Sequence, residues 1–396
     1  MRILNRQTLV LSLGAFLVMI GVSLVAPILP LYARQFGVGR TAAGALISSF
    51  AAARLLFDVA GGILADRWGA RRVMVAGALL LSAASVAAAL APTYGLLLAA
   101  RVVEGVGSAM YATAATQLLV AITPRERLGR TMAVYQTGLL SGIAVGPIIG
   151  GYAAEMGNFT TPFWIYAGVG LLVAGVVGVL VRSGPTVSAT LGDTLRASAR
   201  VLRSGPFLAL LFVTFAIFVM RAGARITLIP LYAGEELGLA ESDIGVILAV
   251  SAVATVFVVN PGGWLVDRIG RKPVLIAGLL LTAVATAGYG MMSTFASLVA
   301  VSVGFGVVAA FAGIPPPTLA GDLAPPDATG AAVGIYRMAG DLGVVVGPLM
   351  VGAIAEDGAF GVGFLATAGV LVVAALVALA IPETGGRRMV AEDAGV

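Results

Sequence analysis

The residues most able to take part in binding or proton transfer are charged side chains inside long apolar segments. Three of them are carboxylates, Asp58, Glu104 and Asp341. A charge at membrane depth is unfavourable unless it is paired or hydrated, so such residues are functional candidates by default. The chain contains no histidine. We therefore expect one of these three carboxylates to carry the proton in any process that is coupled to protons.

The arginines in these segments indicate either anion binding or gating. Arg221 and Arg225 lie one helical turn apart, and their own segment contains no acid. Two guanidinium groups can hold a carboxylate or a phosphate, which predicts an anionic or zwitterionic ligand. The alternative is that one of them closes an outer gate by pairing with Glu104 or with an acid of the next loop.

Arg101 and Glu104 lie three residues apart, a spacing at which side chains meet on one helix. Glu104 could carry a proton, or the two residues could form a static pair. Aromatic residues such as Tyr111 and Phe218 suit an amphipathic ligand, although such residues also face lipid or core. The candidate substrate contacts are Arg101, Tyr111, Phe218, Arg221 and Arg225.

The apolar segments that must position these residues indicate a membrane protein. The chain is 59% hydrophobic and 11% charged, whereas soluble domains are roughly 25% charged. A membrane span needs about 20 apolar residues, and the sequence contains twelve such runs. They cover residues 8–32, 41–64, 73–91, 95–121, 130–153, 161–181, 206–232, 241–265, 274–292, 295–320, 329–354 and 359–381.

The second half of the chain repeats the first. Residues 62–72 form a charged turn between two apolar runs, and residues 263–272 nearly repeat it 201 positions later. The same offset relates Gly146-Pro147 to Gly347-Pro348. This duplication predicts two membrane bundles that bind ligands at their interface. We expect a first bundle over residues 1–181, a cytoplasmic linker over 182–205, and a second bundle with a short cytoplasmic tail over 206–396.

The basic residues predict the orientation in the membrane. Most of the 24 arginines and lysines lie in alternate loops and near both ends of the chain. Basic loops stay in the cytoplasm, so we expect both termini to be cytoplasmic. The formal net charge of +5 then reflects topology. Because the arginines are spread over many loops, we expect no nucleic-acid partner.

The residue types also exclude several classes of function. The chain has no cysteine, so we expect neither a disulfide framework nor a thiolate metal site. Lys272 is followed by Pro273 instead of Ser or Thr, so the chain has no Walker A loop for ATP. We find no nucleophile–base pattern and no cofactor loop, and we expect neither an enzyme nor a resident cofactor. Uphill work must then be driven by an ion gradient or by a partner.

Three motifs together resemble those of the major facilitator superfamily. Residues 62–72 and 263–272 are similar to its loop motif between spans 2 and 3 and between spans 8 and 9. Arg101 and Glu104-Gly105 are similar to its span-4 motif. A glycine-rich face in the fifth run resembles the span-5 motif of proton-antiporting drug and metabolite exporters. That face contains Gly142, Gly146, Pro147, Gly150 and Gly151.

The resemblance covers essentially the whole chain. It implies an all-α membrane protein with 12 transmembrane helices in two pseudo-symmetric six-helix bundles. It also implies a secondary active transporter that works by alternating access, with proton-coupled efflux of small amphipathic organic compounds as the expected function. The expected partners are a small-molecule substrate, protons and the lipid bilayer, and we expect a monomer in the cell (inner) membrane.

The resemblance assigns a gating role to the two loop motifs. In the family, the aspartate that ends span 2 meets the N-terminus of span 11, where helix amides favour negative charge. Asp66 and Arg67 are therefore expected to latch the cytoplasmic side, with Asp267 and Arg268 in the second copy. The alternative is that the motif only sets topology and the shape of the turn.

Spans 2 and 11 are neighbours in that fold, so their charges could meet. Arg54 and Asp58 lie four residues apart in the second run, and Arg337 and Asp341 lie four apart in the eleventh. One interpretation is two pairs, each within its own helix. The other is a crossed clasp that joins Asp58 to Arg337 and Arg54 to Asp341, and that loosens when a carboxylate is protonated.

The sequence departs from one pattern that is common among exporters. The first run has no acidic residue between Leu9 and Tyr32, so a cationic-drug mechanism that depends on a span-1 carboxylate is not expected to apply. Two alternative functions stay open. A symporter of an organic anion is favoured by the arginines and disfavoured by the span-5 motif, and a flippase for lipids or lysolipids would need a wide apolar cavity.

Overall fold

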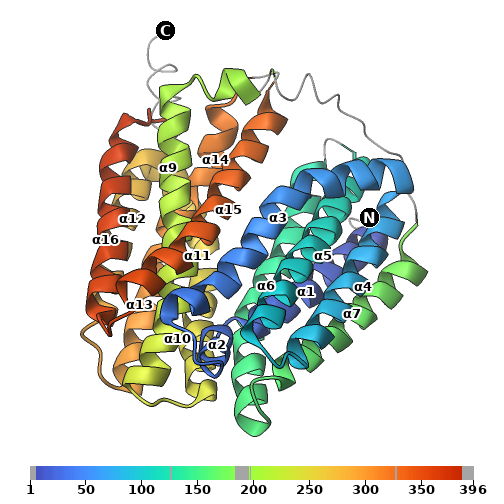
Figure 1. Cartoon of the computed structure of the whole chain (residues 1–396). Coiled ribbons are helices and arrows are strands. Elements are labelled where there is room, and N and C mark those ends of the chain that lie inside the picture. Colours follow the sequence, from blue (N-terminus) through green and yellow to red (C-terminus); the bar gives the residue numbers. More distant parts are fainter. Residues whose placement is uncertain (1–5, 125–126, 183–195, 197, 326–327, 386–396) are drawn as a thin grey trace. The chain divides into compact units, whose positions relative to one another are not determined.

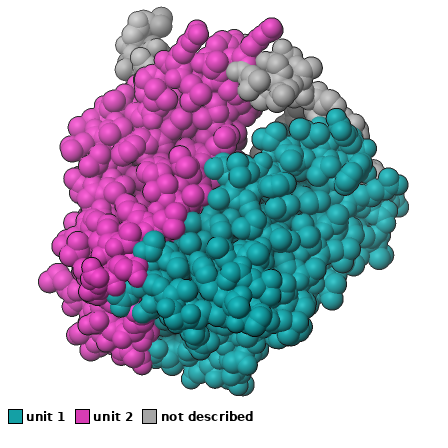
Figure 2. Space-filling model, in the orientation of Figure 1, with its two compact units in different colours: residues 1–188, 239–249 teal, residues 189–238, 250–396 magenta. Residues whose placement is uncertain are grey.

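The computed structural model describes the chain except residues 1–5, 125–126, 183–195, 197, 326–327 and 386–396. The described residues form helices and connecting turns and contain no strand (Figure 1). Within them, twelve helices are long and apolar enough to cross a membrane. The all-α prediction is therefore confirmed. The structure divides into two compact units, which are coloured separately in Figure 2.

Unit 1 contains residues 1–188 and 239–249. In it α1 packs on α6 and α7, α4 packs on α5 and α7, and α3 packs on α5. Apolar side chains on these contact faces are buried, as expected for helices that share one core. The helices are α1 (Arg6–Val25), α2 (Leu29–Arg34), α3 (Arg40–Trp68), α4 (Ala70–Ala89), α5 (Tyr94–Ala121), α6 (Leu128–Met156) and α7 (Thr161–Leu180).

Unit 2 contains residues 189–238 and 250–396, so the grouping divides α11 at residue 249. In it α15 packs on α9 and η2, and α12 packs on α13 and α16. The elements are α9 (Gly205–Val219), η2 (Met220–Leu228), α10 (Ile229–Leu231), η3 (Tyr232–Glu236), α11 (Glu241–Ile269), α12 (Arg271–Tyr289), α13 (Phe295–Gly313), α14 (Pro315–Asp322), α15 (Thr329–Ile354), α16 (Phe360–Val377) and η4 (Ala378–Ala380). The expected linker at 182–205 lies largely outside the described residues.

Two membrane helices of unit 2 are irregular. The tenth span is interrupted between Gly313, which ends α13, and Pro315, which begins α14. Three consecutive prolines follow this point, and each lacks the N–H that would continue the α-helix, so the sequence predicts the break. The seventh span changes from α-helix to π-helix at Met220. That change was not predicted from the sequence, and π-helical turns occur frequently at functional sites.

The two units repeat each other's close helix contacts. Gly105 of α5 lies against the carbonyl of Phe50, and Gly306 of α13 lies against the carbonyl of Ser251, which is the equivalent position 201 residues later. In both contacts a side chain on the glycine would strike the backbone of the neighbouring helix. Small residues of this kind let membrane helices approach closely. The duplication therefore extends to the packing within each unit.

Tight glycine turns position the two loop motifs. Gly69 joins α3 to α4 with a φ of 83°, and Gly270 joins α11 to α12 with a φ of 110°. Glycine adopts positive φ without the steric cost that a side chain would add. Each turn therefore lets a long helix reverse direction immediately after the Asp-Arg sequence of the motif.

Candidate functional site

Arg101 and Glu104 on α5 are deeply buried in unit 1. Arg101 is 4% exposed and Glu104 is 0% exposed. Their side chains form an ion pair across one turn of the helix. Ser85 of α4 donates a hydrogen bond of 2.7 Å to the other carboxylate oxygen. The guanidinium carbon of Arg101 lies 4.6 Å from the centre of the Phe50 ring on α3. Both charges are thus satisfied by helices of their own unit.

Two tyrosines of unit 1 are also deeply buried. Tyr111 of α5 is 1% exposed, and its hydroxyl lies against Gly14 of α1. Tyr166 of α7 is equally buried, and it is close enough to Glu104 for an electrostatic interaction. Tyr111 was a candidate substrate contact, as was Arg101. In this structure the helices of unit 1 enclose both side chains.

Asp58 of α3 has a different environment. It is partly buried, and Thr113 of α5 donates a hydrogen bond of 3.2 Å to its carboxylate. Arg54 lies one turn earlier on α3, but no ion pair joins these two residues in the described part of the chain, and the buried Nε of Arg54 has no hydrogen-bond partner there. Asp58 is therefore held by a neutral hydroxyl.

The remaining charges of the expected clasp lie on α15 in unit 2. Arg337 is exposed and Asp341 is partly buried. Arg54 and Asp58 belong to unit 1, so the crossed clasp would join residues of different units. It stays a prediction, as does the role of Asp341 as a proton carrier.

The charged residues of the two loop motifs lie at the ends of α3 and α11. Asp66 is partly buried, whereas Arg67, Asp267 and Arg268 are exposed. The guanidinium carbon of Arg268 lies 4.5 Å from the centre of the Trp264 ring, a cation–π contact. The latch between Asp66 and the start of span 11 would join the two units and also stays a prediction.

A basic residue in each motif ties the following helix to the last span of its unit. Arg71 of α4 donates to the carbonyl of Gly178 on α7. Lys272 of α12 is its repeat equivalent and donates at 2.6 Å to the carbonyl of Leu379 in η4. The two acceptors are also equivalent, 201 positions apart. This basic residue therefore has a structural contact in addition to the effect on topology that the sequence predicts.

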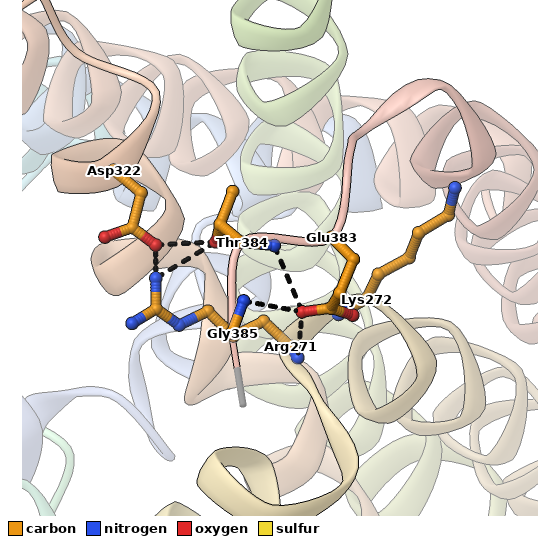
Figure 3. Close-up of polar contacts among 6 residues, drawn as sticks. All are labelled: Arg271, Lys272, Asp322, Glu383, Thr384 and Gly385. Atoms are coloured by element: carbon orange, nitrogen blue, oxygen red, sulfur yellow. Dashed lines mark hydrogen bonds and ion pairs between the residues drawn. The ribbon is translucent and has the colours of Figure 1, made fainter. Parts of the chain in front are cut away.

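In unit 2 a carboxylate reinforces this connection (Figure 3). Glu383 follows the last span and accepts hydrogen bonds from the backbone N–H groups of Arg271 and Lys272 at 2.8 and 3.0 Å. The N–H groups of Thr384 and Gly385 also donate to it, at 3.1 and 2.9 Å. Burial alone raises the pKa of the Glu383 carboxyl, but these four hydrogen bonds outweigh it and hold the pKa below its usual value.

The same cluster includes the end of α14. Arg271 forms an ion pair with Asp322 and donates a hydrogen bond of 3.0 Å to the hydroxyl of Thr384. That hydroxyl donates in turn to Asp322 at 2.6 Å. This cluster was not predicted from the sequence. Its signal was an acid directly after the last apolar run, Glu383, at a position where the first half of the chain has Arg182.

The span-5 motif forms a contact face on α6. Gly142, Gly146 and Gly150 lie against the backbone of α1, and Ser23 of α1 donates a hydrogen bond of 2.9 Å to the carbonyl of Gly142. Gly151 lies against the first turn of α11, within the segment that groups with unit 1. The glycines thus serve close packing, and α6 continues through Pro147.

The arginines of unit 2 lie in the π-helix η2. The guanidinium carbon of Arg221 is 5.2 Å from the centre of the Phe218 ring, and its Nη2 would lie 2.8 Å from a Cβ atom at Gly313. Arg225 lies one turn further along η2 and interacts electrostatically with Tyr289 of α12. The structure therefore brings the predicted residues Phe218, Arg221 and Arg225 together in one unit.

Comparison with known proteins places the chain in a family. The sequence model of the Major Facilitator Superfamily matches residues 11–232 and 210–393. The chain belongs to this superfamily. It is 29% identical over 189 residues to the quinolone resistance protein NorA of Staphylococcus aureus, a match that spans 48% of each chain, or about half the length of that relative. It is 24% identical over 365 residues to the uncharacterized MFS-type transporter MJ1560 of Methanocaldococcus jannaschii, covering 89% of this chain and 92% of that one.

Solved structures of the superfamily share the fold. A bacterial homologue of the human lysosomal transporter Spinster, in an inward-facing and occupied conformation, aligns with a TM-score of 0.78 at 17% identity over 94% of this chain and 95% of the other. A D-xylose–proton symporter aligns with a TM-score of 0.78 at 19% identity over 96% and 99%. The prediction of a major facilitator fold with 12 membrane helices is thereby confirmed, and the protein is a multi-pass membrane protein.

Proposed function

We propose that this transporter exports small amphipathic organic compounds in exchange for protons by alternating access. It would lie in the cell membrane with both termini in the cytoplasm and act as a monomer of two bundles. Membership of the superfamily, similarity to a quinolone resistance protein and the glycine face of α6 support export. The basic loops support the orientation.

The environment of Asp58 is the observation that carries the coupling proposal. A proton carrier must be stable both charged and neutral, and it must be reachable from water. Asp58 is partly exposed and is bound by the hydroxyl of Thr113. A threonine hydroxyl can donate to a carboxylate or accept from a carboxylic acid, so this hydrogen bond can persist in both protonation states. We assign Asp58 as the proton carrier.

Glu104 is the weaker candidate. Its carboxylate is fully buried and receives an ion pair from Arg101 and a hydrogen bond from Ser85. Protonation would leave the Arg101 guanidinium buried without its counter-charge, which is strongly unfavourable. We therefore assign Arg101 and Glu104 to the stability of unit 1.

Proteoliposomes with an acidic interior and an enclosed pH-sensitive dye test this function. A quinolone, ethidium and 1-naphthaleneacetate are each added outside, and we expect at least one to raise the internal pH as protons leave. Asp58→Asn should abolish this compound-dependent flux, because an amide cannot carry the proton. The matched control Asp357→Asn removes an exposed carboxylate of a loop and should leave the flux unchanged.

Two results would contradict the proposal. If Asp58→Asn retains compound-dependent proton flux, Asp58 is not the carrier. If the folded wild-type protein produces no flux with any compound, proton antiport is wrong. An organic-anion symporter, which the arginines of η2 favour, would instead move the compound and protons in the same direction.

A further inference from the structure

The guanidinium group of Arg221 lies over the ring of Phe218 and beside Gly313. Within the part of the chain that the structure describes, it forms no hydrogen bond and no ion pair. A guanidinium group carries five N–H donors and stays charged in proteins. At membrane depth such a group needs acceptors.

Among the described residues, Arg221 interacts electrostatically with a phenol and with a second cation. It is close enough to Tyr336 of α15 for an electrostatic interaction, but a phenol carries no formal charge at neutral pH. Arg225 is near enough to repel it. Tyr289, which interacts with Arg225, shares a hydrogen bond of 2.8 Å with the buried hydroxyl of Ser302. Arg221 thus lies beside a phenol, an aromatic ring and a second cation.

The surrounding backbone is irregular on two sides. Arg221 lies in the π-helix η2, and its Nη2 lies beside Gly313, where α13 ends before the prolines of α14. A side chain at Gly313 would collide with the guanidinium group. Irregular backbone at membrane depth is tolerated where it is covered by protein or lines a cavity, and π-helical turns often mark functional sites.

Unit 1 has no counterpart of this cluster. The positions 201 residues before Arg221 and Arg225 are Ile20 and Leu24, which are 9% and 0% exposed. They lie in α1, an uninterrupted α-helix. The scaffold therefore folds with apolar residues at these positions, so folding does not require the two arginines.

We propose that Arg221 and Arg225 bind the anionic group of the transported compound, a carboxylate or a phosphate on an amphipathic body that lies against Phe218. This proposal deepens the proposed function by naming the substrate class, and it rests on that function only for the statement that the bound compound is transported. Arg221 supplies paired donors of the geometry that fits a carboxylate or phosphate. The tyrosine hydroxyls can supply further hydrogen bonds to the ligand.

Equilibrium binding without a pH gradient tests the proposal. Purified protein is titrated by calorimetry with 1-naphthaleneacetate and with its neutral analogue 1-naphthaleneacetamide. A second pair, lysophosphatidate and monoacylglycerol, is titrated into protein in nanodiscs. We expect the anion of at least one pair to bind more tightly than its neutral analogue. If 1-naphthaleneacetate binds more tightly than its amide, the substrate is a soluble anion. If only lysophosphatidate binds more tightly than its neutral analogue, the ligand is a lipid headgroup.

Variants locate the site. Arg221→Gln should weaken binding of the preferred anion by about tenfold to a hundredfold, because a charge-assisted hydrogen bond is lost. Arg221→Lys keeps the charge but loses the planar fork of the guanidinium group. Its affinity for the anion should therefore lie between those of the wild type and of Arg221→Gln. Arg203→Gln removes an exposed arginine from the same unit and should leave binding unchanged.

The proposal is overturned if each anion binds no better than its neutral analogue, if neither anion binds saturably, or if Arg221→Gln keeps the preference for the anion. None of these measurements depends on proton flux. Anion binding without compound-dependent flux would therefore refute proton antiport and leave the binding site intact, whereas flux without anion preference would do the reverse.

Discussion

The two units share a scaffold but place their charges differently. In the membrane part of unit 1, Arg101 and Glu104 neutralise each other and Ser85 completes their hydrogen bonds. In the membrane part of unit 2, Arg221 meets an aromatic ring and a second cation, Arg225. The buried charges of this pair in unit 1 thus neutralise each other, whereas the arginines of unit 2 form the site at which we propose that an anion binds.

The ends of the units that carry the loop motifs show the opposite distribution. Both units tie the helix after the loop motif to the last span through equivalent basic residues, Arg71 and Lys272. Unit 2 adds the carboxylate of Glu383, whereas the equivalent position in unit 1 is Arg182. The shared features are glycine contacts and backbone hydrogen bonds, which build the scaffold. The charged groups differ between the units, and we expect function to depend on those differences.

The largest expected effect on stability comes from breaking the Arg101–Glu104 ion pair of unit 1. Arg101→Gln leaves the Glu104 carboxylate buried without its counter-charge, which should lower the free energy of unfolding by about 3–5 kcal/mol. Denaturant or thermal unfolding in detergent micelles measures this loss. The double variant Arg101→Gln with Glu104→Gln should recover part of it, because no isolated charge remains. A single variant as stable as the wild type would show that the pair is not needed for folding.

A smaller effect is expected at the end of unit 2. Glu383→Gln removes the negative charge of the carboxylate that accepts hydrogen bonds from four backbone N–H groups. The free energy of unfolding should fall by about 0.5–1 kcal/mol, at the low end for a helix cap because the site is partly exposed. The melting temperature near pH 7 measures it. Glu155→Gln, which removes an exposed carboxylate from unit 1, is the matched control and should have no effect.

The pH dependence of Glu383→Gln sharpens this prediction. The pKa of Glu383 is lower in the folded than in the unfolded protein, so its stabilisation is fully present above the unfolded pKa. It is lost as the pH falls through the folded pKa. The difference in melting temperature between wild type and variant should therefore shrink on acidification below about pH 4. A constant difference in melting temperature over that range would show that the ionised carboxylate of Glu383 is not the source of the stabilisation.

The smallest effect on stability is expected at Arg221. Arg221 has no hydrogen-bond acceptor among the described residues, and its neighbour Arg225 is also a cation. Arg221→Gln should therefore change the free energy of unfolding by less than about 0.5 kcal/mol or raise it. Unfolding of this variant in parallel with Arg101→Gln gives a direct comparison. A loss as large as that of Arg101→Gln would show that Arg221 is a structural residue, and the contrast between the units would fail.

The sequence by itself determined the scaffold. The lengths of the apolar runs set twelve membrane helices, because each must cross the hydrocarbon layer with its own backbone hydrogen bonds satisfied. The repeat at 201 residues predicted two bundles, and Gly105 and Gly306 make equivalent contacts in the two units. The triple proline predicted the break before α14, since proline lacks the required N–H. These features depend on local sequence, so they can be predicted without the fold.

Only the tertiary structure decided the partners of the charged residues. Spacing allowed Asp58 to pair with Arg54, but its hydrogen bond is with Thr113 on another helix. Glu383 binds the start of α12, more than a hundred residues earlier in the chain. Helical spacing shows which residues share a face, whereas the rotation and depth of each helix decide what that face meets. Those quantities are set by packing between distant segments, and they determine which charges are neutralised and which can bind a ligand.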